Sequence, residues 1–116
     1  MTNARVEGRE AGRRVRVRVG DVEIDREQAR VFVAGEPVRL RPKEYRLLVE
    51  LSLQVGRAVA RDRLLRRVWG PEYAGRATTL EVHVSRLRAK FGPALRLETI
   101  RRCGYRLRPP VSANGT

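Results

Sequence analysis

Residues 78–91 hold the side chains best suited to contact a nucleic acid. Four apolar residues recur there so that a turn of about 100° per residue places them on one side of a helix: Leu80, Val84, Leu87 and Phe91. The opposite side combines small residues with Val82, Ser85 and Arg86. An arginine can donate hydrogen bonds to guanine or to phosphate, a serine to a base edge or phosphate, and a valine can pack on thymine methyl groups. This face predicts a helix that enters the major groove of DNA.

Further polar groups stand at the start and edges of this helix. Thr78 and Thr79 lie at its expected N-terminus, where free backbone N–H groups favour an anion such as phosphate. Three more side chains flank the outward face: His83, Arg88 and Lys90. The competing interpretation is a solvated arginine face on a surface helix, with Val82 covered by a neighbouring element.

The charge balance favours the nucleic-acid interpretation. The 26 lysines and arginines outnumber the 13 aspartates and glutamates, so the formal net charge is +13. Such an excess repels itself in a compact chain unless a polyanion offsets it, and a strongly basic domain is typical of nucleic-acid binders. A GC-rich genome could explain why arginine outnumbers the two lysines, Lys43 and Lys90, but not why cations outnumber acids. On charge alone, anionic membranes and acidic protein surfaces are alternative partners.

The other reactive residue types form no catalytic or metal-binding pattern. One histidine, His83, and one cysteine, Cys103, cannot supply the roughly four ligands of a structural zinc site, and a nucleophilic pair also needs an orienting group. With no glycine-rich phosphate loop and no paired carboxylates, we expect no enzyme, catalytic residue, metal or cofactor.

Cysteine usage and hydropathy indicate the compartment. A single cysteine permits no internal disulfide and fits a reducing compartment. Residues 1–18 lack the apolar run of a signal peptide, and no stretch is long enough to span a membrane. We therefore expect a cytoplasmic protein with no membrane partner.

A change in apolar period predicts the elements that position these residues. Apolar residues alternate through residues 15–40 and predict three or four short antiparallel strands with one buried face. Pro42 suits a first helical position, and Leu53 is expected among the inward residues of the helix that it opens. Helical spacing predicts three helices, over residues 42–54, 61–69 and 78–91. A strand-like C-terminal end with a turn at 101–104 completes an α+β fold.

The same patterns divide the chain. We expect a disordered basic lead or linker over residues 1–14, a folded domain over 15–108 and a flexible tail over 109–116. Trp69 is expected to pack the second helix onto the third, Tyr105 to pack beneath the C-terminal hairpin, and Cys103 to lie in its turn.

Five stretches of the chain resemble those of a known family. The run LEVHVSRLRAKF at 80–91 is similar to the recognition helix of OmpR/PhoB-type winged-helix domains, the effector domains of two-component response regulators. Four other stretches resemble family landmarks in the same order: LRPKEY at 40–45, RDRLL at 61–65, VWG at 68–70 and TIRRCGYRL at 99–107. The resemblance implies a winged helix-turn-helix with an N-terminal antiparallel sheet, three helices and a C-terminal β-hairpin wing.

The resemblance also implies a site. On the helix, the positions that match family contacts to base edges or phosphates are Val82, His83, Ser85, Arg86 and Arg88. Thr99 and Arg101 match wing residues that touch the DNA backbone and minor groove, where an arginine fits the negative potential of a narrow groove. Residues 70–77 correspond to a loop that can meet RNA polymerase. Family members pair head-to-tail on direct repeats, so a monomer that pairs on double-stranded DNA is expected.

Several residues depart from the family pattern. Arg41 and Ala60 replace the usual helix caps, so the first capping box is expected to be lost at a cost of about 1 kcal/mol. Thr78 and Ser85 stand where arginines are common. Arg102 stands where glycine is usual. Either this position has a positive φ and the arginine is strained, or the turn differs from the family's and Arg102 adds a DNA contact.

The chain has no stretch that could form the receiver domain of a response regulator. An excised effector domain, a stand-alone regulator, or another class such as the actinobacterial antibiotic regulators are therefore all open. A basic RNA-binding module is a second hypothesis, which the shortage of exposed aromatic residues weakens. A protein-interaction module that docks on an acidic partner is a third.

Overall fold

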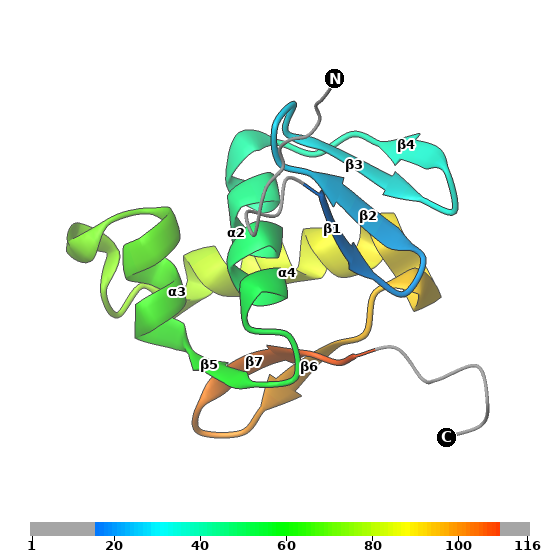
Figure 1. Ribbon diagram of the computed structural model, residues 1–116. Coiled ribbons are helices and arrows are strands. Elements are labelled where there is room, and N and C mark those ends of the chain that lie inside the picture. The colour runs from blue at the N-terminus through cyan, green and yellow to red at the C-terminus, as the bar shows by residue number, and fades with distance from the viewer. Residues whose placement is uncertain (1–15, 110–116) are drawn as a thin grey trace.

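The computed structural model describes residues 16–109, so the expectations for residues 1–14 and for most of the C-terminal tail lie outside the described part. A four-stranded sheet lies beside helix α2 (Pro42–Leu53), a three-stranded sheet lies beyond the end of α2 that leads into β5 (Ala58–Ala60), and helix α4 (Ala77–Phe91) crosses behind α2 (Figure 1). The N-terminal strands are β1 Arg16–Val19, β2 Val22–Asp25, β3 Arg30–Val33 and β4 Glu36–Val38. The helices are α2 Pro42–Leu53, α3 Arg61–Val68 and α4 Ala77–Phe91, and the remaining strands are β5 Ala58–Ala60, β6 Leu97–Ile100 and β7 Gly104–Leu107.

The N-terminal sheet is an antiparallel meander in the order β1-β2-β3-β4, as the alternation predicts. Val22 and Ile24 on β2 and Val31 on β3 are buried, because every second residue of a strand faces the core. Arg16 and Arg18 point to solvent and pair with Glu23 on the neighbouring strand. The sheet therefore has one apolar face that the helices cover.

The three helices begin and end within about two residues of the predicted positions. At the start of α2 the backbone N–H of Arg41 donates to the Glu44 carboxylate over 2.9 Å, so one half of the capping box is kept. The expected loss of the whole box is therefore wrong, because the Glu44 half needs no serine or threonine at residue 41. Leu53 also differs from its prediction, since it lies on the last turn of α2, beyond the core, and is 46% exposed.

The C-terminal sheet has the strand order β5-β7-β6, so it contains one strand more than the predicted hairpin. β5 was not predicted because it has only three residues, of which Val59 alone is buried. The backbone of β5 passes so close to β7 that a Cβ atom on Gly104 would lie 1.9 Å from the carbonyl oxygen of Val59. We call β6, β7 and the turn between them the wing, residues 97–107.

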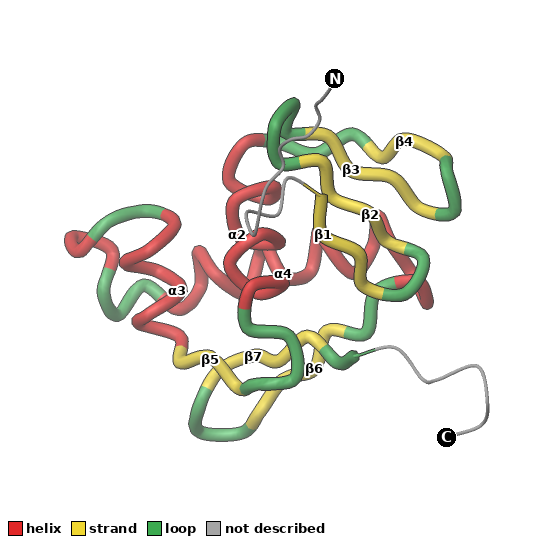
Figure 2. The backbone as a smooth tube through the Cα atoms, viewed as in Figure 1, coloured by secondary structure: helices red, strands yellow, loops and turns green. Residues whose placement is uncertain are grey.

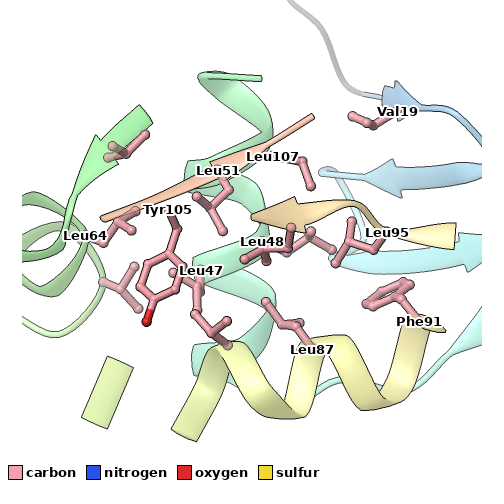
Figure 3. Packing of buried hydrophobic residues seen from close by; sticks show 14 of the residues in the cluster. Val19, Leu47, Leu48, Leu51, Leu64, Leu87, Phe91, Leu95, Tyr105 and Leu107 are labelled. Atoms are coloured by element: carbon pink, nitrogen blue, oxygen red, sulfur yellow. The ribbon is translucent and has the colours of Figure 1, made fainter. Parts of the chain in front are cut away.

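One core joins the helices and both sheets. Side chains of α2, α4 and β7 converge in it, among them Leu47, Leu87 and Leu107 (Figure 3). The predicted inward stripe of α4 is confirmed, since none of its four residues is more than 5% exposed: Leu80, Val84, Leu87 and Phe91. Tyr105 is buried beneath the wing and Trp69 packs against the core, both as expected.

Candidate nucleic-acid interface

Within residues 16–109, no neighbouring element covers the outward face of α4. Val82 is 40% exposed, and Thr78, Ser85, Arg86 and Ala89 are exposed with it. The interpretation that a neighbouring element buries Val82 is therefore wrong. Arg86 makes no hydrogen bond or ion pair with any residue of 16–109, so its guanidinium keeps all of its donors for a ligand. An exposed arginine can donate hydrogen bonds to the edge of a base pair, and an exposed valine beside it can pack on a thymine methyl group.

The N-terminus of α4 lies slightly upstream of its predicted start. The helix begins at Ala77, and the N–H of Thr79 already donates to the carbonyl of Arg76 over 3.1 Å. At the start of α4, the backbone N–H groups without a backbone partner in the described chain are therefore those of Ala77 and Thr78. The guanidinium of Arg76 stacks 5.2 Å from the centroid of the Tyr73 ring and adds a cation beside them. The sequence reading missed Arg76, although its position just before the helix was a usable signal.

His83 lies at the edge of the outward face and is held by its neighbours. Its Nδ1 lies 2.8 Å from the carbonyl oxygen of Thr79, which can only accept, so Nδ1 carries the hydrogen. Its ring meets the Trp69 ring edge-on, with 4.7 Å between centroids. These contacts fix the ring and leave Nε2 as its free polar atom. Trp69 thereby joins α3 to α4 and is not an exposed stacking platform.

Lys90 is exposed, but its ammonium group makes contacts within the domain. Its Nζ donates to Glu44 Oε1 over 2.7 Å and to the carbonyl oxygen of Arg39 over 3.0 Å. Two of its three hydrogens are thus used inside the domain, and one is left for a ligand. Burial alone would raise the pKa of the Glu44 carboxyl, but hydrogen bonds from Lys90 and from the Arg41 backbone, with the two positive charges, lower that pKa. The ion pair therefore joins the start of α2 to the end of α4.

The guanidinium of Arg88 also forms hydrogen bonds within the protein. Its Nε and Nη2 donate to the carbonyl oxygen of Leu97 over 3.1 and 2.7 Å, and Nη2 donates to Thr99 Oγ1 over 3.0 Å. Arg88 and Thr99 were expected to be separate DNA contacts, Arg88 on the helix and Thr99 on the wing. The structure brings Arg88 and Thr99 together, and their side chains form a hydrogen bond.

The tip of the wing presents two arginines to solvent. Arg101 and Arg102 are exposed and make no ion pair or hydrogen bond through their side chains within residues 16–109. Arg102 has φ 62°, so of the two alternatives for this position the structure has the positive φ. Cys103 closes the same turn, as expected, with its N–H donating to the Ile100 carbonyl over 3.0 Å.

Replacing Arg102 with glycine separates stability from binding. A left-handed conformation costs a residue with a Cβ about 1–2 kcal/mol, while a glycine gives back part of this gain through the freedom of the unfolded chain. We expect Arg102→Gly to raise the free energy of unfolding by about 1 kcal/mol in urea titrations and to weaken duplex binding. Ala34→Gly, at φ 49° in a hairpin remote from the wing, is the matched control and should change stability alone. A less stable Arg102→Gly variant would contradict the strain.

The surface of α3 adds cations that the sequence reading did not assign to the site. Four arginines occur among its eight residues, RDRLLRRV, and Arg63 and Arg66 are exposed. Between α3 and α4 runs the loop that contains the short 3-10 helix Pro71–Tyr73, at the side of the molecule away from the N-terminal sheet (Figure 2). In this loop the Asp62 carboxylate accepts the N–H of Gly75 over 3.1 Å.

Within residues 16–109 no three histidine, cysteine, aspartate or glutamate side chains gather into a possible metal site. Of the described helices, none has the length and apolar content needed to cross a membrane.

The fold and this surface define the class of protein. A four-stranded antiparallel sheet, three helices and a wing form a winged helix-turn-helix domain. In it α3 and α4 form the helix-turn-helix pair, and α4 is the second helix of that pair. Residues 35–107 match the family described as "Transcriptional regulatory protein, C terminal". The chain belongs to this family, that of the OmpR/PhoB-type effector domains.

Relatives in sequence are longer regulators. The chain is 46% identical over 89 residues to the transcriptional regulatory protein CseB of Streptomyces coelicolor, covering 77% of this chain and 38% of that protein. It is 46% identical over 92 residues to the sensory transduction protein RegX3 of Mycolicibacterium smegmatis, covering 76% and 40%. The chain thus spans well under half the length of these relatives.

Solved structures agree with the fold. The DNA-binding domain of Klebsiella pneumoniae RstA, in complex with the RstA box, is 31% identical with a TM-score of 0.74, over 82% of this chain and 98% of that one. The DNA-binding domain of the response regulator AdeR, in complex with an intercistronic region, is 26% identical with a TM-score of 0.66, over 78% and 95%.

Proposed function

We propose that this domain is the DNA-binding effector of a transcriptional regulator, with α4 in the major groove and the wing in the adjacent minor groove of a specific duplex site. One observation carries the proposal. The residues around the outward face of α4 are held by partners inside the protein, whereas Arg86 has none within residues 16–109 and stands beside exposed Val82. The proteins RstA and AdeR, which share the fold, are both solved with DNA.

The proposal assigns a role to each residue of the site. Arg86 reads a guanine through O6 and N7, Val82 packs on a thymine methyl group, and Ser85 donates to a phosphate or a base edge. The free N–H groups at Ala77 and Thr78 hold a phosphate with Arg76. Arg101 enters the minor groove, and Thr99 and Arg102 contact the backbone beside it.

The assembly that we propose follows the family pattern. The domain is a monomer in solution that pairs head-to-tail on direct repeats, in a cytoplasmic protein without catalytic activity. Loop 70–77, which is exposed except at Tyr73 and its two ends, is the surface we assign to RNA polymerase.

Selection of bound duplexes from a random pool tests the whole proposal. We expect a short conserved sequence, repeated in the same orientation and spaced by about one helical turn of roughly 10 base pairs. Enrichment without a sequence preference, or displacement of duplex DNA by A-form or single-stranded RNA at matched salt, would contradict it and favour the RNA-binding alternative.

Salt dependence tests the electrostatic part. Each phosphate neutralised contributes about −0.9 to the slope of log affinity against log salt concentration. With four outward cations at Arg76, Arg86, Arg101 and Arg102, we expect a slope of about −4 or steeper by fluorescence anisotropy. Arg101→Ala should reduce the slope by about 0.9, and should weaken binding most when the flanking minor groove is A·T-rich. A slope near zero would remove the electrostatic argument.

A further inference from the structure

The edge of the wing carries a carbonyl group that the sheet itself does not satisfy. β6 is the outer strand in the order β5-β7-β6. The Arg96 carbonyl accepts the N–H of Arg108 over 2.8 Å and so points toward β7. Because hydrogen-bonding groups alternate along an antiparallel strand, the next carbonyl, that of Leu97, points away from β7 at the open edge.

Arg88 of α4 satisfies this carbonyl. Both Nε and Nη2 donate to the Leu97 oxygen, and the second hydrogen of Nη2 is donated to Thr99 Oγ1. A planar guanidinium with three hydrogen bonds to one strand permits little rotation or sliding of that strand. Leu97 is itself buried in the core, so the strand is fixed from both its apolar and its polar side.

The same contact orients the hydroxyl of Thr99. Its oxygen accepts a hydrogen bond from Arg88, so its own hydrogen is left to be donated elsewhere. Thr99 is exposed, and the phosphate backbone is the acceptor that the proposed function supplies beside it.

We propose that Arg88 is a positioning residue that fixes the wing against α4 and thereby sets the distance between the two DNA-contacting elements. This inference rests on the proposed function. Arg88 differs in this role from Arg86, which lies two residues earlier and has no partner within residues 16–109. Arg101 and Arg102, at the tip of the wing, directly follow the last residue of β6, so any change in the position of β6 moves both arginines.

The substitution Arg88→Lys tests the inference while keeping the charge. A lysine replaces an arginine well as a point charge on a phosphate, but it cannot form the forked contact to a carbonyl and a hydroxyl. We expect Arg88→Lys to lose about tenfold in affinity for the selected duplex, with Arg26→Lys, on the exposed turn between β2 and β3, unchanged within twofold. An Arg88→Lys variant that binds within twofold of the parent would make Arg88 a simple phosphate contact and overturn the inference.

A double-mutant cycle with Arg101 provides a readout that a general loss of stability would not produce. In the parent, Arg101→Ala should cost about tenfold in affinity; in the Arg88→Lys background it should cost less than about twofold, because the wing is no longer held in the groove. Equal costs in both backgrounds would overturn the inference.

Amide hydrogen exchange of the DNA-free protein keeps the two proposals apart. We expect Arg88→Lys to increase exchange in β6 and β7 at least fivefold while exchange in α2 stays unchanged; unchanged exchange in the wing would overturn the positioning role. A parent protein that binds no duplex selectively would contradict the proposed function, whereas this measurement would still test the contact between Arg88 and the wing.

Discussion

Lys90→Met is expected to lower the free energy of unfolding by about 3 kcal/mol, because it leaves the carboxylate of Glu44 buried without its ammonium partner. Glu44 is 0% exposed, and its Oε2 has no hydrogen-bond partner in the described chain. After the substitution only the Arg41 N–H would still donate to the carboxylate. Urea denaturation measures the change, and methionine preserves the length and helix propensity of the side chain.

Lys43→Met is the matched control. Its Nζ donates to the Val68 carbonyl over 3.2 Å and to no carboxylate of residues 16–109, so the loss should be about 1 kcal/mol. The double variant Glu44→Leu with Lys90→Met should be more stable than Lys90→Met alone, since no charge then remains buried. Equal losses for the two single lysine variants would contradict the role of the ion pair.

The same carboxyl makes stability depend on pH in a defined direction. The pKa of the Glu44 carboxyl is lower in the folded protein than in the unfolded chain, where a glutamate has a pKa of about 4.3. The stability that Glu44 contributes is therefore complete above the unfolded value and is lost as the pH falls through the lower, folded value. Glu44→Gln should be less stable at neutral pH and should lose less stability than the parent on acidification. A parallel pair of pH profiles would contradict this assignment.

Arg86→Ala is expected to cost about 1–3 kcal/mol in binding to the selected duplex, which is about 5-fold to 150-fold in affinity. The cost arises because the guanine edge loses a two-point donor, and preference should relax at one base pair alone. Affinity for cognate and scrambled duplexes, measured side by side at one salt concentration, reports both effects.

Arg26→Ala is the matched control for this second prediction. Arg26 is an exposed arginine in the turn between β2 and β3, on the side of the molecule opposite the wing (Figure 1). Arg26→Ala removes the same charge from a surface that faces neither DNA groove in the proposed complex, so this substitution should change affinity less than twofold. If Arg86→Ala weakens cognate and scrambled binding equally, Arg86 is a phosphate contact and the base-reading role is wrong.

Local patterns were sufficient to predict much of the fold. The alternation from Val17 onward identifies the N-terminal strands, and the helical period of Leu80 and Val84 identifies both the buried and the open face of α4. These features were predictable because a strand or helix presents its faces at a fixed period. β5 was not, since three residues with one buried side chain carry no period.

The internal partners of the flanking cations could not be predicted in the same way. Lys90 meets Glu44 across 46 residues of sequence, and Arg88 meets Thr99 across 11. Such pairs depend on the tertiary arrangement of α2, α4 and β6, which no local spacing encodes. From sequence, all exposed cations of α4 resembled DNA contacts, while the structure distinguishes Arg86, without a partner in the described chain, from two that hold the fold.

The close approach of β5 and β7 divides the wing into a part that can change and a part that cannot. A side chain at residue 104 would meet the Val59 carbonyl oxygen at 1.9 Å, and backbone atoms cannot yield as a flexible side chain can. Arg101 and Arg102, two to three residues earlier, touch nothing comparable. Under the proposed function, substitutions at the exposed residues 101 and 102 are therefore expected to alter flanking-sequence preference while the base of the hairpin stays constant, with the φ of 62° at residue 102 as the local constraint.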